Sequence, residues 1–197
     1  MLAVEYRKAP EHPFPVPIDD CVRAYGALLR SGVAPEDVVV AGDSAGGGLA
    51  LALAQRLRAT GTPQPRALVL LSPWTDLGNS GDSHRALADI DPVLAYDPGL
   101  RLSAAAYAPG AEDHPDASPL LADYDAGFPP TLIVCGSREI LLSDSLRLHR
   151  RLRAAGATAE IDVHDGLFHS FTTVAPKSPE AAEARSGIRR FVDRNRL

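Results

Sequence analysis

The stretch VVVAGDSAGGGLALALAQRL, residues 38–57, decides the fold of this 197-residue chain. Residues 38–41 form a short run, mostly of β-branched valine, that suits a buried strand. Residues 45–58 are apolar on nearly all sides, as in a helix that packs against several neighbours. The pentapeptide GDSAG, residues 42–46, connects the two, so glycines and one serine stand at a turn from strand to helix.

Ser44 lies at the centre of this turn, in a G-x-S-x-G pattern. In a sharp strand-to-helix turn the serine takes a strained backbone conformation, and residues without side chains make room for it. We therefore interpret Gly42, Asp43, Ser44 and Gly46 as a nucleophile elbow. The serine hydroxyl is then displayed at the carboxyl end of the strand. The free N–H of Ala45, at the helix start, points to where an oxyanion would form.

A turn that binds an anion, or nothing, is the alternative interpretation of the same glycines. A phosphate-binding loop is the anion-binding turn to consider here, and it requires a lysine after the glycines. Here Leu49 follows Gly48, so this form is disfavoured.

Strand and helix alternate along the rest of the chain. Further strands are expected at residues 67–71, 131–135 and 159–163, and further helices at 18–29, 143–155 and 179–197. Residues 76–128 differ in composition, being rich in Pro, Gly and Asp, with short helical pieces at about 82–88 and 98–108. The alternation predicts an α/β fold with a mostly parallel sheet flanked by helices. We expect a single domain, 1–197, with a helical excursion at 76–128.

Composition limits the partners of the chain. Its 20 basic and 25 acidic residues give a net charge of −5 without long like-charge runs, which argues against nucleic acid or an anionic membrane surface. No window reaches the roughly 18–20 apolar residues of a membrane span, and the first residues lack a signal-peptide layout. Cys21 and Cys135 lie in apolar surroundings and are expected as buried thiols in a reducing compartment, so we expect a cytoplasmic protein.

A serine needs a base to take its proton and an acid that fixes the base. After the strand at 131–135 the chain offers Glu139 and Asp144, and after the strand at 159–163 it offers His164 and His169. The order serine, acid, histidine is that of open α/β-hydrolase sheets. Asp144 has a second interpretation, as the cap of the helix that starts near residue 143.

The other histidines and three aromatic residues are weaker candidates. His84, His114 and His149 show no metal-ligand spacing and are expected at the surface, so no metal site is predicted. Trp74, Tyr96 and Phe168 are candidates to line an acyl or alcohol pocket, with core packing as the alternative for each.

With these residues in view, the chain resembles the hormone-sensitive-lipase-like branch of the α/β hydrolases, the bacterial family IV esterases. Seven blocks carry the resemblance: VEYRKAPEHPFP, GDSAGGGLA, LLSPWTDL, SGDS, ASPLLADY, PPTLIVCGSREILLSDS and DGLFHSF. The resemblance implies that Ser44 is the nucleophile and His169 the base, with Ser170 in place of the family's glycine. It implies Glu139 as the acid, where the family usually has aspartate, and Asp144 as the alternative acid. It implies no metal or organic cofactor.

The resemblance also implies missing parts. The family has a His-Gly-Gly-Gly oxyanion loop and an N-terminal segment ahead of the block with which this chain begins. Compared with the family, the chain is therefore expected to be an N-terminally truncated α/β hydrolase. Residues 2–7 are expected as a strand whose neighbour is absent, so that it either shifts to pair with the strand at 38–41 or forms an exposed edge.

The expected function is a serine carboxylesterase that hydrolyses small acyl esters through an acyl-enzyme. The alternative is a catalytically impaired hydrolase-fold protein or binding scaffold, since the family's oxyanion loop is absent from the sequence. The expected partner is a small-molecule ester, with no nucleic acid and no membrane span, and a homodimer is possible.

Overall fold

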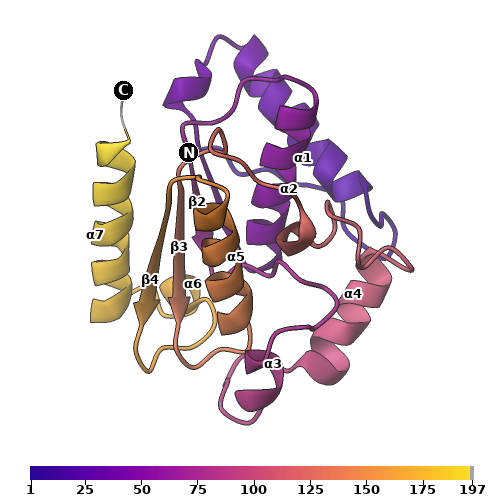
Figure 1. Ribbon diagram of the computed structural model, residues 1–197, viewed down its shortest axis with the longest axis vertical. Helices are drawn as coiled ribbons and strands as arrows, with labels where there is room; N and C mark the ends of the chain where they lie inside the picture. The colour runs from indigo at the N-terminus through magenta and orange to yellow at the C-terminus, as the bar shows by residue number, and fades with distance from the viewer. Residues whose placement is uncertain (196–197) are drawn as a thin grey trace.

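The computed structural model describes residues 1–195 and has a four-stranded parallel sheet at its centre (Figure 1). The strands lie in the order of the chain: β1 (Val39–Asp43), β2 (Ala67–Leu71), β3 (Thr131–Gly136) and β4 (Ala159–His164). The register pairs Asp43 with Leu71 at the end of β1 and β2, and Gly136 with His164 at the end of β3 and β4. All four carboxyl ends therefore meet at one edge of the sheet, the lower edge in Figure 1.

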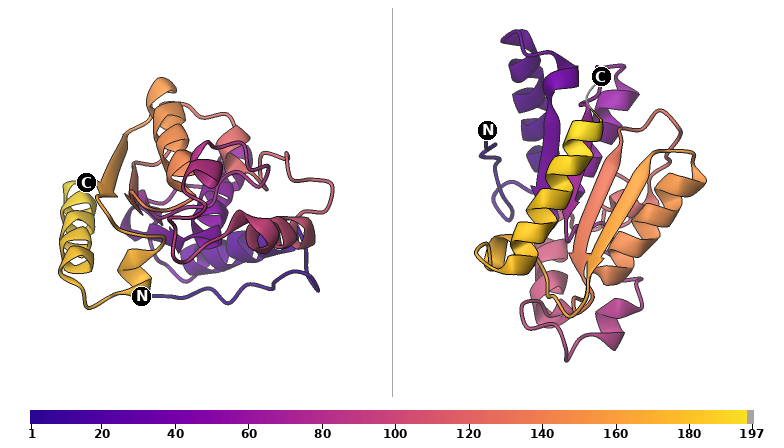
Figure 2. Two further views of the ribbon diagram at one scale, coloured as in Figure 1. Left: turned by 90° about the horizontal axis from the view of Figure 1, so that it is seen from below. Right: turned by 90° about the vertical axis from the view of Figure 1, so that its left-hand side faces the viewer.

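Helices cover both faces of this sheet, as Figure 2 shows. On one face α2 (Ala45–Ala59) and α5 (Leu142–Ala154) enclose a core that includes Leu51, Leu70 and Leu148. On the other face α7 (Pro179–Arg194) and the short α6 (Phe171–Val174) pack against alternate residues of the same strands. α1 (Val16–Arg30) packs on the outer side of α2. Burial on two sides explains why the sequence of α2 is apolar nearly all round.

The predicted α/β architecture is confirmed. β2 has the predicted bounds, and β1, β3, β4, α2 and α5 differ from the prediction by one or two residues at either end. The helix predicted at 179–197 is α7, and the last two positions of that prediction lie outside the described residues. Among residues 1–195, no helix is both long enough and apolar enough to cross a bilayer.

The long connection between β2 and β3 packs over the carboxyl edge of the sheet. It contains α3 (Ser83–Ala86), a helical turn at Tyr96–Leu100, α4 (Arg101–Tyr107) and a 3₁₀ turn at Pro119–Leu121. Many of its apolar residues form a separate cluster with Ile140 and Leu141, which precede α5, while Leu120 and Phe128 join the main core. The connection thus encloses the edge at which the candidate residues stand.

The prediction of a strand at residues 2–7 is wrong: these residues lie outside any strand or helix. A strand requires a neighbour for its backbone hydrogen bonds, and here the Arg7 N–H is donated to Asp20 of α1 at 3.0 Å instead. The Arg7 side chain also donates to this carboxylate, which lowers the pKa of Asp20. Within the described residues β1 is an edge strand, and a groove of about 740 Å³ lies between it and residues 1–6.

Both cysteines are free thiols. Cys135, in β3, is fully buried, as predicted, whereas Cys21, on α1, is half-buried. Burial raises the pKa of the Cys135 thiol to about 12 and that of the Cys21 thiol to about 11.

Candidate active site

Ser44 stands on a tight turn between β1 and α2, with φ 54° and ψ −120°. This positive φ is uncommon for a residue with a side chain and indicates local strain. The turn is held on both sides, because the Ser44 N–H donates to Leu71 O at 2.9 Å and the Ser44 carbonyl accepts from Trp74 N at 3.0 Å. Leu71 is the last residue of β2 and Trp74 lies three residues beyond it, so the end of β2 and the segment after it fix the strained residue.

The glycines around Ser44 are required by close backbone approaches. A Cβ on Gly42 would lie 2.1 Å from the carbonyl oxygen of Gly46, and a Cβ on Gly48 would lie 2.5 Å from that of Trp74. Gly46 itself has open space around its Cβ position. The turn therefore needs Gly42 for its own closure and Gly48 for the contact with the β2 end.

Glu139 occupies the turn after β3 and is completely buried. Its Oε2 accepts two hydrogen bonds, from Ser72 Oγ at 2.7 Å and from Gly136 N at 2.9 Å. Its Oε1 faces Nδ1 of His169 at 3.8 Å, with exposed fractions of 0% and 5% for the two side chains. Within residues 1–195 neither of these facing atoms has another hydrogen-bond partner. The two groups are thus placed to bond to each other after a small approach, and catalytic hydrogen bonds are often long in ligand-free structures.

The loop after β4 carries His169 and is tied to the elbow. Ser170 Oγ donates to Asp43 Oδ1, and Thr173 Oγ1 donates to Asp43 Oδ2 at 2.7 Å. Asp43 immediately precedes Ser44, and Ser170 immediately follows His169. The structure therefore brings the elbow and the histidine loop into direct contact, although 125 residues separate Ser44 from His169 in the sequence.

The alternative residues are engaged elsewhere. Asp144 is buried in the first turn of α5, where it accepts from Thr75 N at 2.9 Å and Asp76 N at 3.0 Å and pairs with His84 Nε2 at 2.8 Å. The interpretation of Asp144 as a helix cap is wrong, since the residue that caps α5 is Leu141. The prediction of His84 at the surface is also wrong, because its side chain is buried against Asp144.

His164, the alternative base, ends β4 and is half-buried. It pairs with Asp162 of its own strand at 3.2 Å, and its ring contacts that of Phe171 at an angle of 48°. Within the described residues no group of three or more His, Cys, Asp or Glu side chains could hold a metal ion.

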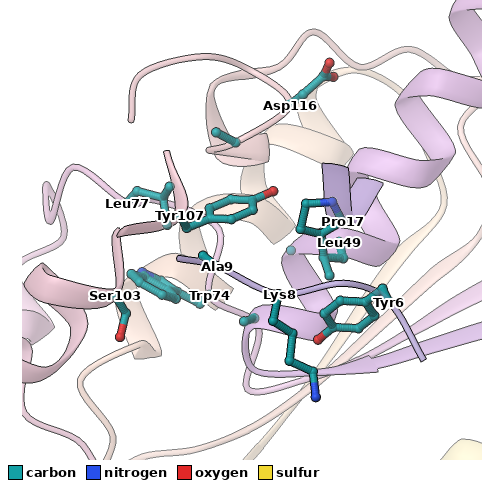
Figure 3. Close-up of a pocket in the computed structure, with 13 residues that line it drawn as sticks. Tyr6, Lys8, Ala9, Pro17, Leu49, Trp74, Leu77, Ser103, Tyr107 and Asp116 are labelled. Carbon is teal, nitrogen blue, oxygen red and sulfur yellow. The ribbon is translucent and has the colours of Figure 1, made fainter. Parts of the chain in front are cut away.

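A small apolar cavity of about 160 Å³ opens beside the start of α2 (Figure 3). Ala45, the first residue of α2, is part of its wall, and its N–H has no acceptor inside the helix because of its position. Trp74 lines the cavity and is also buried in the cluster of the β2–β3 connection, so it combines the two expected roles of pocket lining and core packing. Tyr107 and Leu49 lie around the cavity as well. The other two aromatic candidates, Tyr96 and Phe168, pack in core clusters.

Sequence reasoning missed the buried polar residues that support these groups. Ser72 bonds to Glu139 and to the N–H of Ser170, and Ser170 bonds to Asp43. A signal for Ser72 existed: it directly follows a strand in the same block as Trp74, at the edge where the other candidates end. No local pattern indicates its positive φ of 44°.

Comparison with known proteins agrees with the fold. Residues 1–173 match a family described as alpha/beta hydrolase fold. The chain is 41% identical over 185 residues to an acetyl-hydrolase of Streptomyces hygroscopicus, covering 93% of this chain and 61% of the relative. It is 37% identical over 196 residues to an esterase of Acinetobacter venetianus, covering 97% and 63%.

Solved structures give the same result. An esterase from the bacterial hormone-sensitive lipase family matches with a TM-score of 0.90 and 41% identity, over 98% of this chain and 63% of that one. The esterase EstE5, soaked with ethyl alcohol, matches with a TM-score of 0.92 and 39% identity, over 96% and 64%. The chain spans less than two thirds of the length of these proteins. From the matched family, the sequence identities and the TM-scores, we conclude that the chain belongs to the alpha/beta hydrolase fold family, in its hormone-sensitive-lipase-like esterase branch.

Proposed function

We propose that this chain is a serine carboxylesterase that hydrolyses small acyl esters through an acyl-enzyme. The observation that carries the proposal is the buried pair of Glu139 and His169, held by the Ser170–Asp43 hydrogen bond beside the strained Ser44. A buried carboxylate that faces an imidazole next to a displayed hydroxyl is the arrangement that activates a serine nucleophile.

The proposed reaction has two steps. Ser44 Oγ attacks the ester carbonyl while His169 Nε2 takes the hydroxyl proton, and Glu139 Oε1 accepts the Nδ1–H of the imidazolium. The tetrahedral oxyanion binds the Ala45 N–H, then collapses to an acyl-serine as His169 returns the proton to the departing alcohol. Water, deprotonated by His169, attacks the acyl-serine through a second tetrahedral intermediate. Its collapse releases the carboxylic acid and returns the proton to Ser44.

The cavity supports a small substrate. Its volume of about 160 Å³ lies below the roughly 300–1,000 Å³ of pockets that bind drug-sized ligands. Its wall is mainly apolar, with Trp74, Leu49 and Leu77 among the lining residues. Such a cavity can enclose a short acyl or alcohol group without burying an unpaired polar atom.

A second candidate function is ester binding with little turnover. The oxyanion site favours it, because Ala45 supplies the one backbone donor that we assign there within residues 1–195. Loss of a single oxyanion donor typically lowers kcat by about 10²–10³. The two candidates therefore differ in rate rather than in the site they use.

Hydrolysis of p-nitrophenyl acetate and butyrate by the wild type and by Ser44→Ala tests the proposal. Ser186→Ala is the matched control, since this exposed serine of α7 bonds only within its own helix. We expect turnover in the wild type and in the control and none above background in Ser44→Ala. Equal rates in all three proteins reject catalysis at Ser44. A fluorophosphonate probe separates the two candidates by rate, because labelling of Ser44 requires an activated hydroxyl. Rapid labelling supports turnover, whereas slow labelling or none supports binding with little turnover.

A further inference from the structure

A chain of hydrogen bonds connects Glu139 with the residues next to Ser44 and His169 in the sequence. Ser170 Oγ donates to Asp43, Ser170 N donates to Ser72 Oγ at 3.0 Å, and Ser72 Oγ donates to Glu139 Oε2 at 2.7 Å. Asp43 adjoins Ser44, and Ser170 adjoins His169. We propose that Ser72 and Ser170 are positioning residues that align Glu139, His169 and Ser44, an inference that rests on the proposed function.

Ser72 decides which oxygen of Glu139 faces the histidine. The hydroxyl of Ser72 has one proton, which it donates to Oε2, and its lone pair accepts the N–H of Ser170. Because Gly136 N also donates to Oε2, that oxygen carries two donors and Oε1 remains for His169. One buried hydroxyl therefore holds both the acid and the backbone next to the base.

Both serines have left-handed backbones, which is unusual for residues with side chains. Ser72 has φ 44° and Ser170 has φ 53° with ψ 33°. Such conformations cost on the order of 1–3 kcal/mol each and persist only where the surrounding structure holds them. The two strained residues are bonded to each other, and each is bonded to a carboxylate. Because Ser72 and Ser170 are both strained and together connect Glu139 to the loop of His169, we assign them a role in aligning these two side chains.

The histidine loop has a second attachment that does not depend on these bonds. Phe171 is buried in the core cluster between the sheet and α7. The loop should therefore stay docked when a serine hydroxyl is removed, while the orientation of the imidazole changes. For this reason we expect the substitutions to affect rate more than folding.

The experiment compares two substitutions in the full chain with a matched control. Ser170→Gly keeps the N–H bonded to Ser72, suits the positive φ and removes only the bond to Asp43. Ser72→Ala removes both the bond to Glu139 and the acceptor for Ser170. The control is Ser137→Ala, because Ser137 also bridges the turns after β3 and β4, accepting from Gly166 N at 2.7 Å and donating to Asp165, without contact to Glu139 or His169.

The readouts are kcat and KM for p-nitrophenyl butyrate, the pH profile of kcat/KM and the rate of fluorophosphonate labelling. We expect kcat to fall about tenfold in Ser170→Gly and about 10²-fold in Ser72→Ala, with KM nearly unchanged, because a misplacement of about 1 Å can lower a rate 10²-fold. In Ser72→Ala the imidazolium loses alignment with its carboxylate, so the acid limb of the profile moves to lower pH. Labelling slows in the same order.

The results that overturn the inference differ from those that overturn the proposed function. If the wild type is labelled at Ser44 and both variants match Ser137→Ala in kcat, pH profile and labelling rate, the positioning role is refuted while the esterase stands. Should Ser72→Ala fail to fold, an unchanged kcat and labelling rate in Ser170→Gly refutes the connection to the elbow. If Ser44→Ala reacts as fast as the wild type, the proposed function fails and the inference fails with it.

Discussion

Replacing Glu139 by glutamine tests its proposed role as the acid more sharply than removing the side chain does, because the structure fixes how the new amide must lie. Oε2 of Glu139 receives two donors, Ser72 Oγ at 2.7 Å and Gly136 N at 2.9 Å. Only the carbonyl oxygen of the glutamine can take that position, since an NH₂ group there would face two donors. The NH₂ group must then occupy the position of Oε1, opposite His169 Nδ1.

This orientation changes which ring nitrogen of His169 carries the proton. An NH₂ group donates to Nδ1, so the imidazole proton moves to Nε2, which can then no longer accept the proton of Ser44. In a serine protease triad, the comparable replacement lowers kcat by about 10⁴, which corresponds to about 5.4 kcal/mol in activation free energy. Both donors to the former Oε2 keep their acceptor, so we expect the free energy of unfolding to change by only about 1 kcal/mol.

The assay is p-nitrophenyl butyrate hydrolysis at neutral pH, combined with thermal unfolding to confirm the fold. Glu160→Gln is the matched control, since this half-exposed carboxylate of β4 pairs with Arg194 away from the site. We expect wild-type kcat in the control and a loss of about 10⁴ in Glu139→Gln. A Glu139→Gln protein that folds and keeps a tenth or more of the wild-type kcat refutes the reasoning.

Three further predictions concern stability. Gly42→Ala places a Cβ 2.1 Å from a backbone oxygen and should lower the free energy of unfolding by about 1–3 kcal/mol or more. Gly46→Ala meets open space and should stabilise α2 by up to about 1 kcal/mol. Urea unfolding that ranks the two variants the other way contradicts this prediction. Asp144→Ala leaves His84 and two backbone donors unpaired and should lower the free energy of unfolding by about 3–5 kcal/mol. The kcat of the folded fraction, measured by active-site titration, should stay near the wild-type value. Burial raises the pKa of the Cys135 thiol to about 12. Its contribution to the free energy of unfolding is therefore complete below about pH 9 and is lost toward pH 12 at about 1.4 kcal/mol per pH unit. A Cys135→Ala protein whose stability in urea falls equally steeply at alkaline pH argues against this prediction.

Local sequence patterns were sufficient to predict an element where the residues that form it also determine its conformation. The valine run and the glycines predicted β1, the elbow and α2, because strand propensity and the steric demands of the turn act over short distances. The same holds for α5 and α7, whose apolar spacing faces the sheet. The position of Glu139 and His169 at neighbouring strand ends followed from the order of the elements.

Features that depend on distant partners were not predictable in this way. His84 is polar and lies in the long connection between β2 and β3, and its burial depends on Asp144, 60 residues later. Residues 2–7 have the composition of a strand, but a strand exists only beside another, and the Arg7 N–H is paired with α1. The left-handed backbones of Ser72 and Ser170 likewise depend on contacts across the sheet edge rather than on their neighbours in sequence.

The hydrogen bond between Asp43 and Ser170 joins residues 127 positions apart, which makes it one of the widest loop closures in the molecule. Closing so long a loop carries an entropic penalty that only the docking of the intervening β2, β3 and β4 can offset. The Ser44 turn itself needs β2 in place, since its N–H donates to Leu71 O, and the hydrogen bond to the histidine loop needs β4 in place as well. The proposed alignment of His169 with Ser44 therefore requires the assembled sheet, and any opening that releases β4 disrupts it.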